Sequence, residues 1–250
     1  MNFDFKVQKG LDKKTVELAK KLKSDFTRTF PVFVMHLPYG FTSETLSKRV
    51  KYRIYKFNSD SNNSETYNFK NGFGYVSLNS KILRRDYHKA FQYFSHGVAH
   101  SFTCFNKFGL EFKTLMEEMN AELVGYRALE FLLENNDEKD VIIERVKKAS
   151  PSKYTEAYEI GERLEEKKPG FLRKLNSLLY QLERNSPTSI LKRIPFLKFL
   201  DKEEKIIEKV EKEFLEACKE LGIKKEKLED LERRFGNEKM YLREEIFIPI

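Results

Sequence analysis

The clearest hydrophobic pattern in the chain is a helical stripe of aromatic residues that follows Asp86. Apolar side chains recur at spacings of three and four residues: Phe91, Phe94, Val98, Phe102 and Phe105. At 100° per residue these positions share one face, which predicts a helix that is buried along that face. His96 and His100 lie one turn apart on the opposite side. The two histidines are therefore expected to face a second environment rather than the aromatic stripe.

A second helix is predicted from Glu111 to about Glu134. Its apolar residues recur at spacings of three, four or seven, and Glu118 and Glu122 fall inside the same stripe. Burying a carboxylate without a partner costs several kcal/mol, so two glutamates on a packing face need an explanation. A metal ion shared with the two histidines is one explanation, because two imidazoles and one carboxylate leave zinc an open position for water.

Strand patterns are concentrated in the N-terminal half. Residues 48–57 alternate basic with apolar or aromatic side chains, which is typical of a half-buried strand. Lysines on such a strand favour an edge position that resists sheet-to-sheet association, although interleaved basic and aromatic residues are also found where a nucleic-acid strand binds. Residues 67–79 predict two short strands that turn at Asn71-Gly72. Val32–Leu37 and the apolar end Ile246–Ile250 are further strand candidates, the latter as a packed strand or tail.

Helical periodicity dominates the remainder. Leu11–Phe30 predicts an amphipathic helix with Asp12 as its N-cap and Pro31 as its end. In the C-terminal half Gly222 is predicted to stop one helix before another begins. The segments expected to be helical there are Val141–Ala149, Tyr154–Glu166, Phe171–Arg184, Ile190–Leu200 and Asp201–Phe235. The fold class is thus α+β, with a small N-terminal antiparallel sheet and a mostly α-helical C-terminal half.

The order of these motifs resembles the gluzincin branch of the zincin metallopeptidases. A strand at Tyr75 to Leu78 precedes His96-Gly97-Val98-Ala99-His100, and a later helix reads Glu118-Met119-Asn120-Ala121-Glu122. The family pattern is HExxH followed by a helix of the type E-G-x-A-E. The resemblance covers roughly residues 71–161. It implies a zincin-like fold that binds one zinc ion through His96, His100 and Glu118.

The resemblance also implies roles for other residues. Glu122 is expected to orient a ligand histidine from outside the coordination shell. Tyr75 to Leu78 is expected to be the edge strand along which a peptide or protein substrate pairs through its backbone. A tyrosine often lies near the open metal position in such proteins, where it donates to an oxyanion, and Tyr154 or Tyr158 is the candidate here. His88 lies about 80° off the face of His96, so it is not expected to be a ligand.

Gly97 departs from the family pattern. The family's general base follows the first histidine directly, and a glycine carries no carboxylate to activate a zinc-bound water. Glu117 and Glu122 are conceivable substitutes. Two explanations compete for Gly97, namely close approach of a neighbouring segment and loss of a catalytic glutamate, and we favour the second. The predicted function is a degenerate or atypical relative of zinc metallopeptidases; any activity would be that of a zinc-dependent peptidase.

Charge suggests two alternatives of a different class. The 250 residues carry a formal net charge of +8. Residues 1–110 hold 19 basic and 8 acidic side chains, a pattern compatible with acidic partners, although no nucleic-acid motif accompanies it and we do not expect nucleic-acid binding. Lys/Glu-rich helices in residues 201–235 could instead dock a protein. In that case the chain is a non-enzymatic helical protein-interaction module whose HxxxH pair is incidental.

Composition sets the remaining expectations. Cys104 and Cys218 are far apart, and no CxxC pattern occurs, so neither a disulfide framework nor a zinc knuckle is indicated. No run approaches the roughly 20 apolar residues that a membrane span requires, and the start of the chain lacks an apolar signal core. A cytoplasmic setting without membrane association is expected. We divide the chain into a metal-binding domain, residues 1–168, and a helical extension, residues 169–250.

Overall fold

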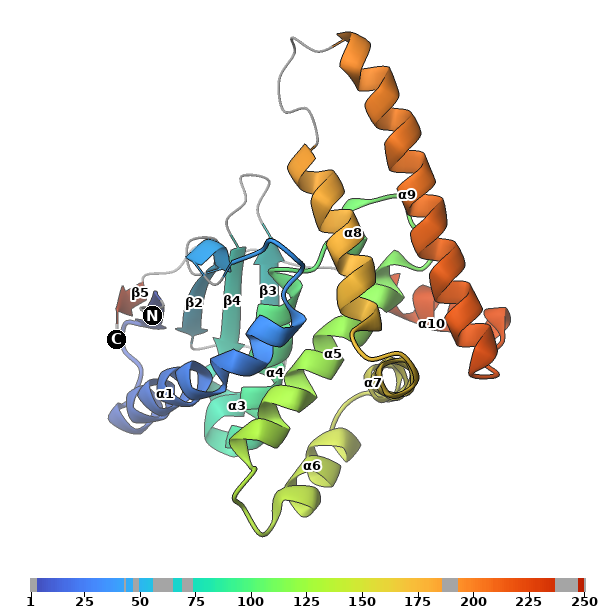
Figure 1. The fold of residues 1–250 in the computed structure, drawn as a ribbon. Coiled ribbons are helices and arrows are strands. Elements are labelled where there is room, and N and C mark those ends of the chain that lie inside the picture. Colours follow the sequence, from blue (N-terminus) through green and yellow to red (C-terminus); the bar gives the residue numbers. More distant parts are fainter. Residues whose placement is uncertain are drawn as a thin grey trace.

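The protein has an α+β fold in which a five-stranded sheet lies at one side of a larger group of helices (Figure 1). The structure is a computed structural model, and it describes residues 4–42, 44–46, 50–55, 65–68, 74–185, 193–236 and 247–249. The sheet order is β3-β4-β2-β1-β5. The strands are β1 (Phe5–Gln8), β2 (Val50–Tyr55), β3 (Glu65–Asn68), β4 (Gly74–Asn79) and β5 (Phe247–Pro249).

The sheet is mixed, so the predicted antiparallel sheet is wrong. β2 pairs in parallel with both β1 and β4, whereas β3 and β5 pair antiparallel at the two edges. The chain between β1 and β2 contains the long helix α1 (Lys13–His36), and a crossover of this kind is what parallel neighbours require. β2 is consequently a central strand and not the predicted edge strand. The antiparallel pairing of β3 with β4 is confirmed, while the turn at Asn71-Gly72 lies outside the described residues.

Helix α1 continues through Pro31, so the strand predicted at Val32–Leu37 is wrong. Proline inside a helix removes one hydrogen bond and costs about 3 kcal/mol. Here the buried stripe of Phe26 and Phe30 continues to Phe33 on the far side of the proline, and burial of that face outweighs the loss. Asp12 is the N-cap, as predicted, and accepts from the backbone N–H of Thr15 at 3.0 Å.

The aromatic stripe of α4 (Tyr87–His100) packs between the sheet and α1. Phe5 and Tyr52 are neighbours on β1 and β2, and both rings lie 5.4 Å from the ring of Phe94. Phe26 of α1 meets Phe94 edge-on at the same distance, 5.4 Å. α4 is preceded by the short helix α3 (Ser80–Arg85), which directly follows β4. The predicted order of strand and histidine-bearing helix is therefore confirmed.

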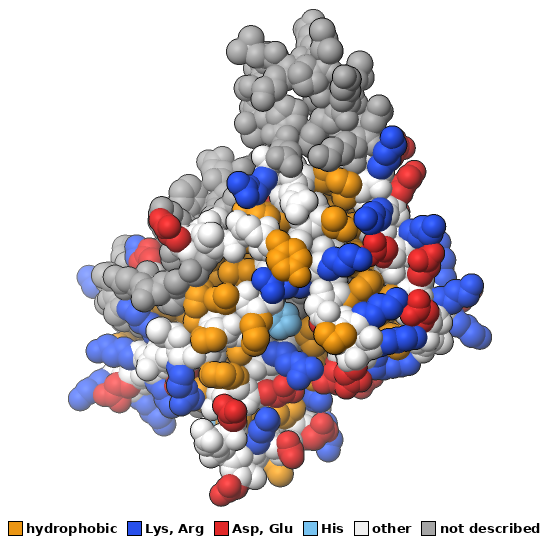
Figure 2. Space-filling model, viewed as in Figure 1, with side chains coloured by type: hydrophobic (Ala, Val, Ile, Leu, Met, Phe, Trp, Pro, Cys, Tyr) orange, Lys and Arg blue, Asp and Glu red, His pale blue; other side chains and the backbone are white. Residues whose placement is uncertain are grey.

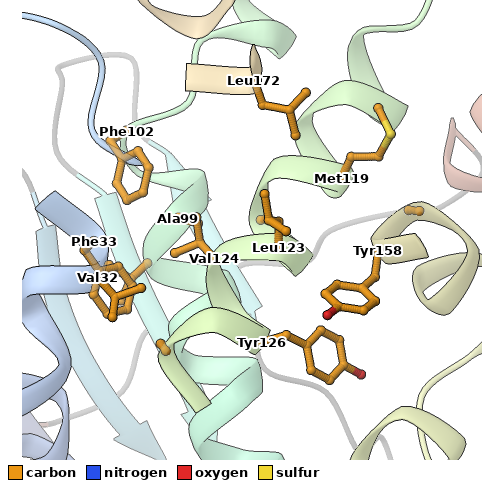
Figure 3. Packing of buried hydrophobic residues seen from close by; sticks show 14 of the residues in the cluster. Val32, Phe33, Ala99, Phe102, Met119, Leu123, Val124, Tyr126, Tyr158 and Leu172 are labelled. Carbon is orange, nitrogen blue, oxygen red and sulfur yellow. The ribbon is translucent and has the colours of Figure 1, made fainter. Parts of the chain in front are cut away.

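Helix α5 (Lys113–Leu132) passes through the middle of the helical part and follows a short 3₁₀ turn, Phe105–Lys107. Figure 3 shows its side chains Met119, Leu123 and Tyr126 in the core. Tyr126 lies beside Tyr158 of helix α7 (Ser152–Lys167). Ala99 of α4 and Leu172 lie in the same buried cluster. α5 thus has α4 on one flank and helices of the C-terminal half on the other.

The C-terminal half consists of five helices in the described residues: α6 (Lys139–Lys148), α7 (Ser152–Lys167), α8 (Phe171–Asn185), α9 (Arg193–Glu220) and α10 (Lys225–Gly236). α9 runs unbroken through residue 201, where the sequence suggested a division. It ends at Glu220, two residues before Gly222, whose φ of 73° is a left-handed conformation that glycine adopts readily; the stop at this glycine was predicted. The apolar end of the chain forms β5, which pairs with β1.

The buried hydrophobic residues form one cluster that includes side chains from both proposed domains. Leu172 and Phe214, for example, belong to the same core as Phe94. The division at residue 168 remains a prediction. Within the described residues, no helix is both long enough and apolar enough to cross a membrane.

Glu232 of α10 caps the N-terminus of α5. Phe112 stands at the N-cap position of α5 and has no side chain that accepts a hydrogen bond there. Glu232 accepts instead from the backbone N–H groups of Thr114 at 3.1 Å and Leu115 at 2.6 Å. A carboxylate at this place satisfies two otherwise unpaired donors and interacts favourably with the helix dipole.

We therefore expect Glu232→Ala to lower the free energy of unfolding by about 1–2 kcal/mol, the upper part of the range for lost N-caps. Glu229→Ala is the matched control, because Glu229 lies on the same helix and makes only an exposed contact with Lys225 at 3.8 Å. Urea denaturation followed by circular dichroism measures both. Equal loss in the two variants would show that the cap contributes nothing specific.

Candidate metal centre

Helix α4 presents His96 and His100 toward α5. The two side chains are only 13% and 14% exposed, while Phe91, Phe94 and Val98 on the opposite side are buried in the main core. Asp86 starts the helix by accepting from the N–H of Lys89 at 3.1 Å. The helix thus has two buried faces of different character, as its sequence pattern predicted.

The three predicted ligands converge. The Nε2 atoms of His96 and His100 lie 2.9 Å apart. Glu118 Oε2 lies 3.3 Å from the first and 3.6 Å from the second. Ligand atoms in a tetrahedral site with bonds of about 2.0–2.2 Å lie roughly 3.3–3.6 Å apart. Both distances to Glu118 fall in this range, whereas the 2.9 Å between the Nε2 atoms is shorter and is that of a hydrogen bond between the two rings. The slight exposure of Glu118, 15%, leaves a side open to solvent.

Each histidine faces a further carboxylate with its other ring nitrogen. His96 Nδ1 lies 2.9 Å from Glu122 Oε1, and His100 Nδ1 forms a hydrogen bond of 3.0 Å with Glu117 Oε1. Both carboxylates are buried. A carboxylate only accepts, so the bond to Glu117 favours a proton on Nδ1 of His100. The contact between His96 Nδ1 and Glu122 is close but is not aligned as a hydrogen bond. We refer to these five residues, His96, His100, Glu117, Glu118 and Glu122, as the His–Glu cluster.

The outer carboxylates are held in turn by polar side chains. Gln92 Nε2 donates to Glu122 Oε2 at 2.9 Å, and the Thr103 hydroxyl donates to Glu117. Glu122 was predicted to approach a histidine rather than the ion; its contact with His96 is confirmed, while its place relative to an ion stays a prediction. The contact of Glu117 with His100 was not predicted. Glu117 lies outside the apolar stripe of α5, so a search for carboxylates within that stripe passed over it, although its place directly before Glu118 was a usable signal.

Glu118 Oε2 has a nearby donor only where an imidazole carries a proton on Nε2. It is buried and receives no well-aligned hydrogen bond, although both imidazoles are near it. An orphaned buried carboxylate oxygen normally costs free energy, and a cation is the partner that removes this cost. Three carboxylates beside two neutral imidazoles also leave an excess of negative charge, which a divalent cation would largely neutralise.

Protons on the two histidines, instead of a metal ion, can also neutralise the negative charge of the carboxylates. Burial by itself lowers the pKa of both histidines, but the carboxylates outweigh it. Glu122 and Glu118 raise the pKa of His96 to about 8, and Glu118 and Glu117 raise that of His100 to about 10. Burial raises the pKa of Glu118, yet the histidines hold it far below its usual range. The cluster therefore favours binding of positive charge, whether protons or a metal ion.

The remaining predicted residues lie in different places. The ring of Tyr154 is 5.9 Å from that of His96, so this tyrosine adjoins the site and also packs on Phe235 of α10. Tyr158 instead lies against Tyr126 at 4.5 Å and donates to Glu162. Gly97 is buried in α4. Of the two tyrosine candidates, the structure brings only Tyr154 to the cluster.

The predicted substrate strand is wrong in its position. Tyr75 to Leu78 belongs to β4, which pairs with β2 on one side and with β3 on the other. Its backbone groups are therefore engaged on both sides and cannot receive an added strand. The sequence predicted the hairpin partner on one side of this strand but could not show that β2 would pair with its other side.

Gly125 allows α4 and α5 to approach closely enough for these contacts. A Cβ atom added at Gly125 would lie 3.1 Å from the backbone oxygen of Gln92 and 3.3 Å from Cβ of His96. Both atoms belong to α4, and Gln92 also holds Glu122. Any larger residue at position 125 would push apart the two helices that carry the ligands.

Comparisons of the sequence with protein-family models, with curated proteins and with solved structures gave no match.

Gly125→Ala is expected to destabilise the protein by about 1–3 kcal/mol through overpacking, despite the higher helix propensity of alanine. Gly161→Ala is the matched control within α7. Its added Cβ would meet Met119 at ordinary contact distances of 3.4 Å and 3.6 Å, so the change should be neutral or stabilise by up to about 1 kcal/mol. Urea unfolding curves compare the two variants. A stable Gly125→Ala protein would show that α4 and α5 do not need this close approach.

Proposed function

We propose that the protein binds one zinc ion in a zincin-like centre, through His96, His100 and Glu118. The observation that carries this proposal is the paired arrangement of the histidines: both Nε2 atoms meet Glu118, and both Nδ1 atoms meet separate buried carboxylates. Carboxylate–histidine pairs of this kind fix the ring orientation and raise the basicity of a metal-binding nitrogen.

Zinc is the metal that suits this donor set best. Two imidazole nitrogens and one carboxylate oxygen, with a small opening to solvent, are the usual three protein ligands of zinc sites that keep a fourth position for water. Sites dominated by oxygen donors suit magnesium and calcium instead. When bound, zinc supplies a Lewis acid that polarises a carbonyl group and lowers the pKa of coordinated water.

The side chains supply no evident base for peptide hydrolysis. Gly97 stands where the zincin pattern has its glutamate. Glu117 and Glu122, the substitutes considered from the sequence, each face a histidine and a further donor, so both act as orienting groups. Tyr154 beside His96 remains a candidate donor to a bound oxyanion. We therefore propose an atypical or degenerate relative of zinc peptidases that retains the metal centre and lacks the proton acceptor.

Metal content is the decisive test. Protein purified without chelator is expected to contain close to one zinc per chain by elemental analysis, and His96→Ala or His100→Ala should abolish binding. The other two histidines, His36 and His88, provide matched controls, because neither belongs to the cluster. Their alanine variants should keep the zinc. A folded wild-type protein that refuses zinc in titration would remove this proposal and favour the protein-interaction module.

Gly97→Glu tests the missing base. Because Gly97 is buried, a glutamate there is expected mainly to destabilise the protein, by about 1–3 kcal/mol through overpacking. The wild type should show no zinc-dependent cleavage of peptides or casein. Cleavage by Gly97→Glu alone would show that the glycine replaced a catalytic residue in an otherwise competent site. Cleavage by the unmodified protein would contradict the proposal that a base is lacking.

A further inference from the structure

A cavity remote in sequence from the His–Glu cluster lies where the end of α1, the C-terminal half of α5 and the start of α8 meet. Its volume is about 440 Å³, within the range of roughly 300–1,000 Å³ that small-molecule sites occupy. Figure 2 shows hydrophobic and basic side chains around a histidine on this face of the molecule. None of the cavity's lining residues belongs to the cluster.

The apolar part of the cavity is unusually exposed. Met35 is 60% exposed and Phe131 is 39% exposed, and both line the cavity. Only three other large hydrophobic side chains are exposed in the described part of the chain, and one of them, Tyr39, packs on the cavity residue Arg173. A single exposed apolar residue needs no explanation, but several rimmed by charged groups are typical of a ligand site.

Arg173 is one of three cations that line the cavity, together with Arg127 and Lys139. Its Nε donates to the backbone oxygen of Leu37 at 2.8 Å, and its guanidinium lies 4.6 Å from the ring centre of Tyr39. No carboxylate forms an ion pair with it in the described residues. By contrast, Arg127 pairs with Glu130 at 3.2 Å. The stacked, anchored guanidinium thus keeps its outer N–H groups for another acceptor.

Of the three carboxylates that line the cavity, Glu130, Glu134 and Glu165, two have a partner within the described residues. Glu165 accepts from the backbone N–H groups of Gly170 at 2.7 Å and Leu172 at 2.8 Å, which caps α8. Glu130 is engaged with Arg127. These acidic groups still repel a ligand of high negative charge, so a single carboxylate is a better match for Arg173 than a phosphate dianion.

His36 lies near both arginines and is neutral. Burial lowers its pKa to about 4, and the charges of Arg127 and Arg173 act in the same direction. A neutral imidazole offers one donor and one acceptor without attracting a second anion. Besides the Lys139 ammonium and three carboxylates, the polar lining therefore includes two guanidiniums and one uncharged ring, and Met35 and Phe131 contribute its exposed apolar part.

We propose that this cavity binds a small carboxylic acid with a hydrocarbon or aromatic part. The carboxylate lies on Arg173, with Arg127 and the His36 ring beside it, and the apolar part covers Met35 and Phe131. A planar guanidinium matches a carboxylate in two parallel hydrogen bonds, and the exposed apolar side chains gain from being covered. This site does not depend on the proposed zinc centre.

Calorimetric titration of the full chain tests the site with octanoate and 3-phenylpropionate, which separate a hydrocarbon from an aromatic ligand. We expect saturable binding of at least one acid with a stoichiometry of one. Octanamide and 3-phenylpropionamide, their uncharged counterparts, should bind at least about 10-fold more weakly, because each lacks the charge-assisted contact. Absence of saturable binding for both acids, or equal binding of acid and amide, would overturn the proposal.

Variants locate the site. Arg173→Gln should weaken acid binding about 10-fold or more. Arg163→Gln is its matched control, since Arg163 donates to the backbone oxygen of Leu221 at 2.7 Å and lies outside the cavity. Met35→Glu places a repelling carboxylate at an exposed position and should also weaken binding without disturbing the core, so it replaces Arg173→Gln if that protein does not fold. Unchanged affinity in Met35→Glu, or equal losses in Arg173→Gln and Arg163→Gln, would exclude this cavity.

Discussion

The packing of α4 against α5 is the constraint on which the rest of the structure depends. Gly125 allows the two helices to approach until the backbone of Gln92 and the Cβ of His96 would touch any added carbon. At that separation His96 and His100 reach three glutamates of the facing helix. The same contact orders the core, because the opposite side of α4 packs Phe94 against β1, β2 and α1. One helix therefore serves an apolar core and a polar site at once.

Burying the carboxylates between α4 and α5 costs free energy unless positive charge lies beside them. Several buried carboxylates next to neutral imidazoles would repel one another in a medium of low dielectric constant. Protons on the histidines reduce this repulsion, which is why the pKa values of both imidazoles are raised. A divalent ion reduces it further and also supplies the partner that Glu118 Oε2 lacks. The negative charge of the carboxylates thus accounts both for the raised pKa values of the two histidines and for the proposed binding of a metal ion.

The C-terminal helices support the cluster from outside. Glu232 of α10 caps the helix that carries all three glutamates, and Phe235 packs on Tyr154 beside His96. The helical extension is therefore more than an appended partner surface. Contacts over such long sequence separations fix the position and rigidity of α5, since a helix N-terminus without a cap frays.

The sequence by itself determined the local features. Periodicity placed His96, His100 and Glu118 on facing helical surfaces, Asp12 marked the start of α1, and Gly222 marked the end of α9. The resemblance to the gluzincin pattern singled out Glu122 as a partner of a histidine, and Glu122 lies beside His96. These features follow from one helical turn or one cap, whose geometry depends on neighbouring residues alone. Periodicity alone could therefore place these side chains, whereas the choice of Glu118 as a ligand came from the resemblance to the gluzincin pattern, and metal binding by the three residues stays a proposal.

Only the tertiary structure decided which elements became neighbours. Alternation in residues 48–57 showed a strand but could not show that β1 and β4 would flank it on both sides. Pro31 suggested a helix end, yet burial of Phe33 beyond it kept α1 continuous. Glu117 became a partner of His100, and Arg173 came to lie beside His36, through contacts between separate helices. Such pairings depend on long-range packing, because burial outweighs local preference wherever a distant segment covers a side chain.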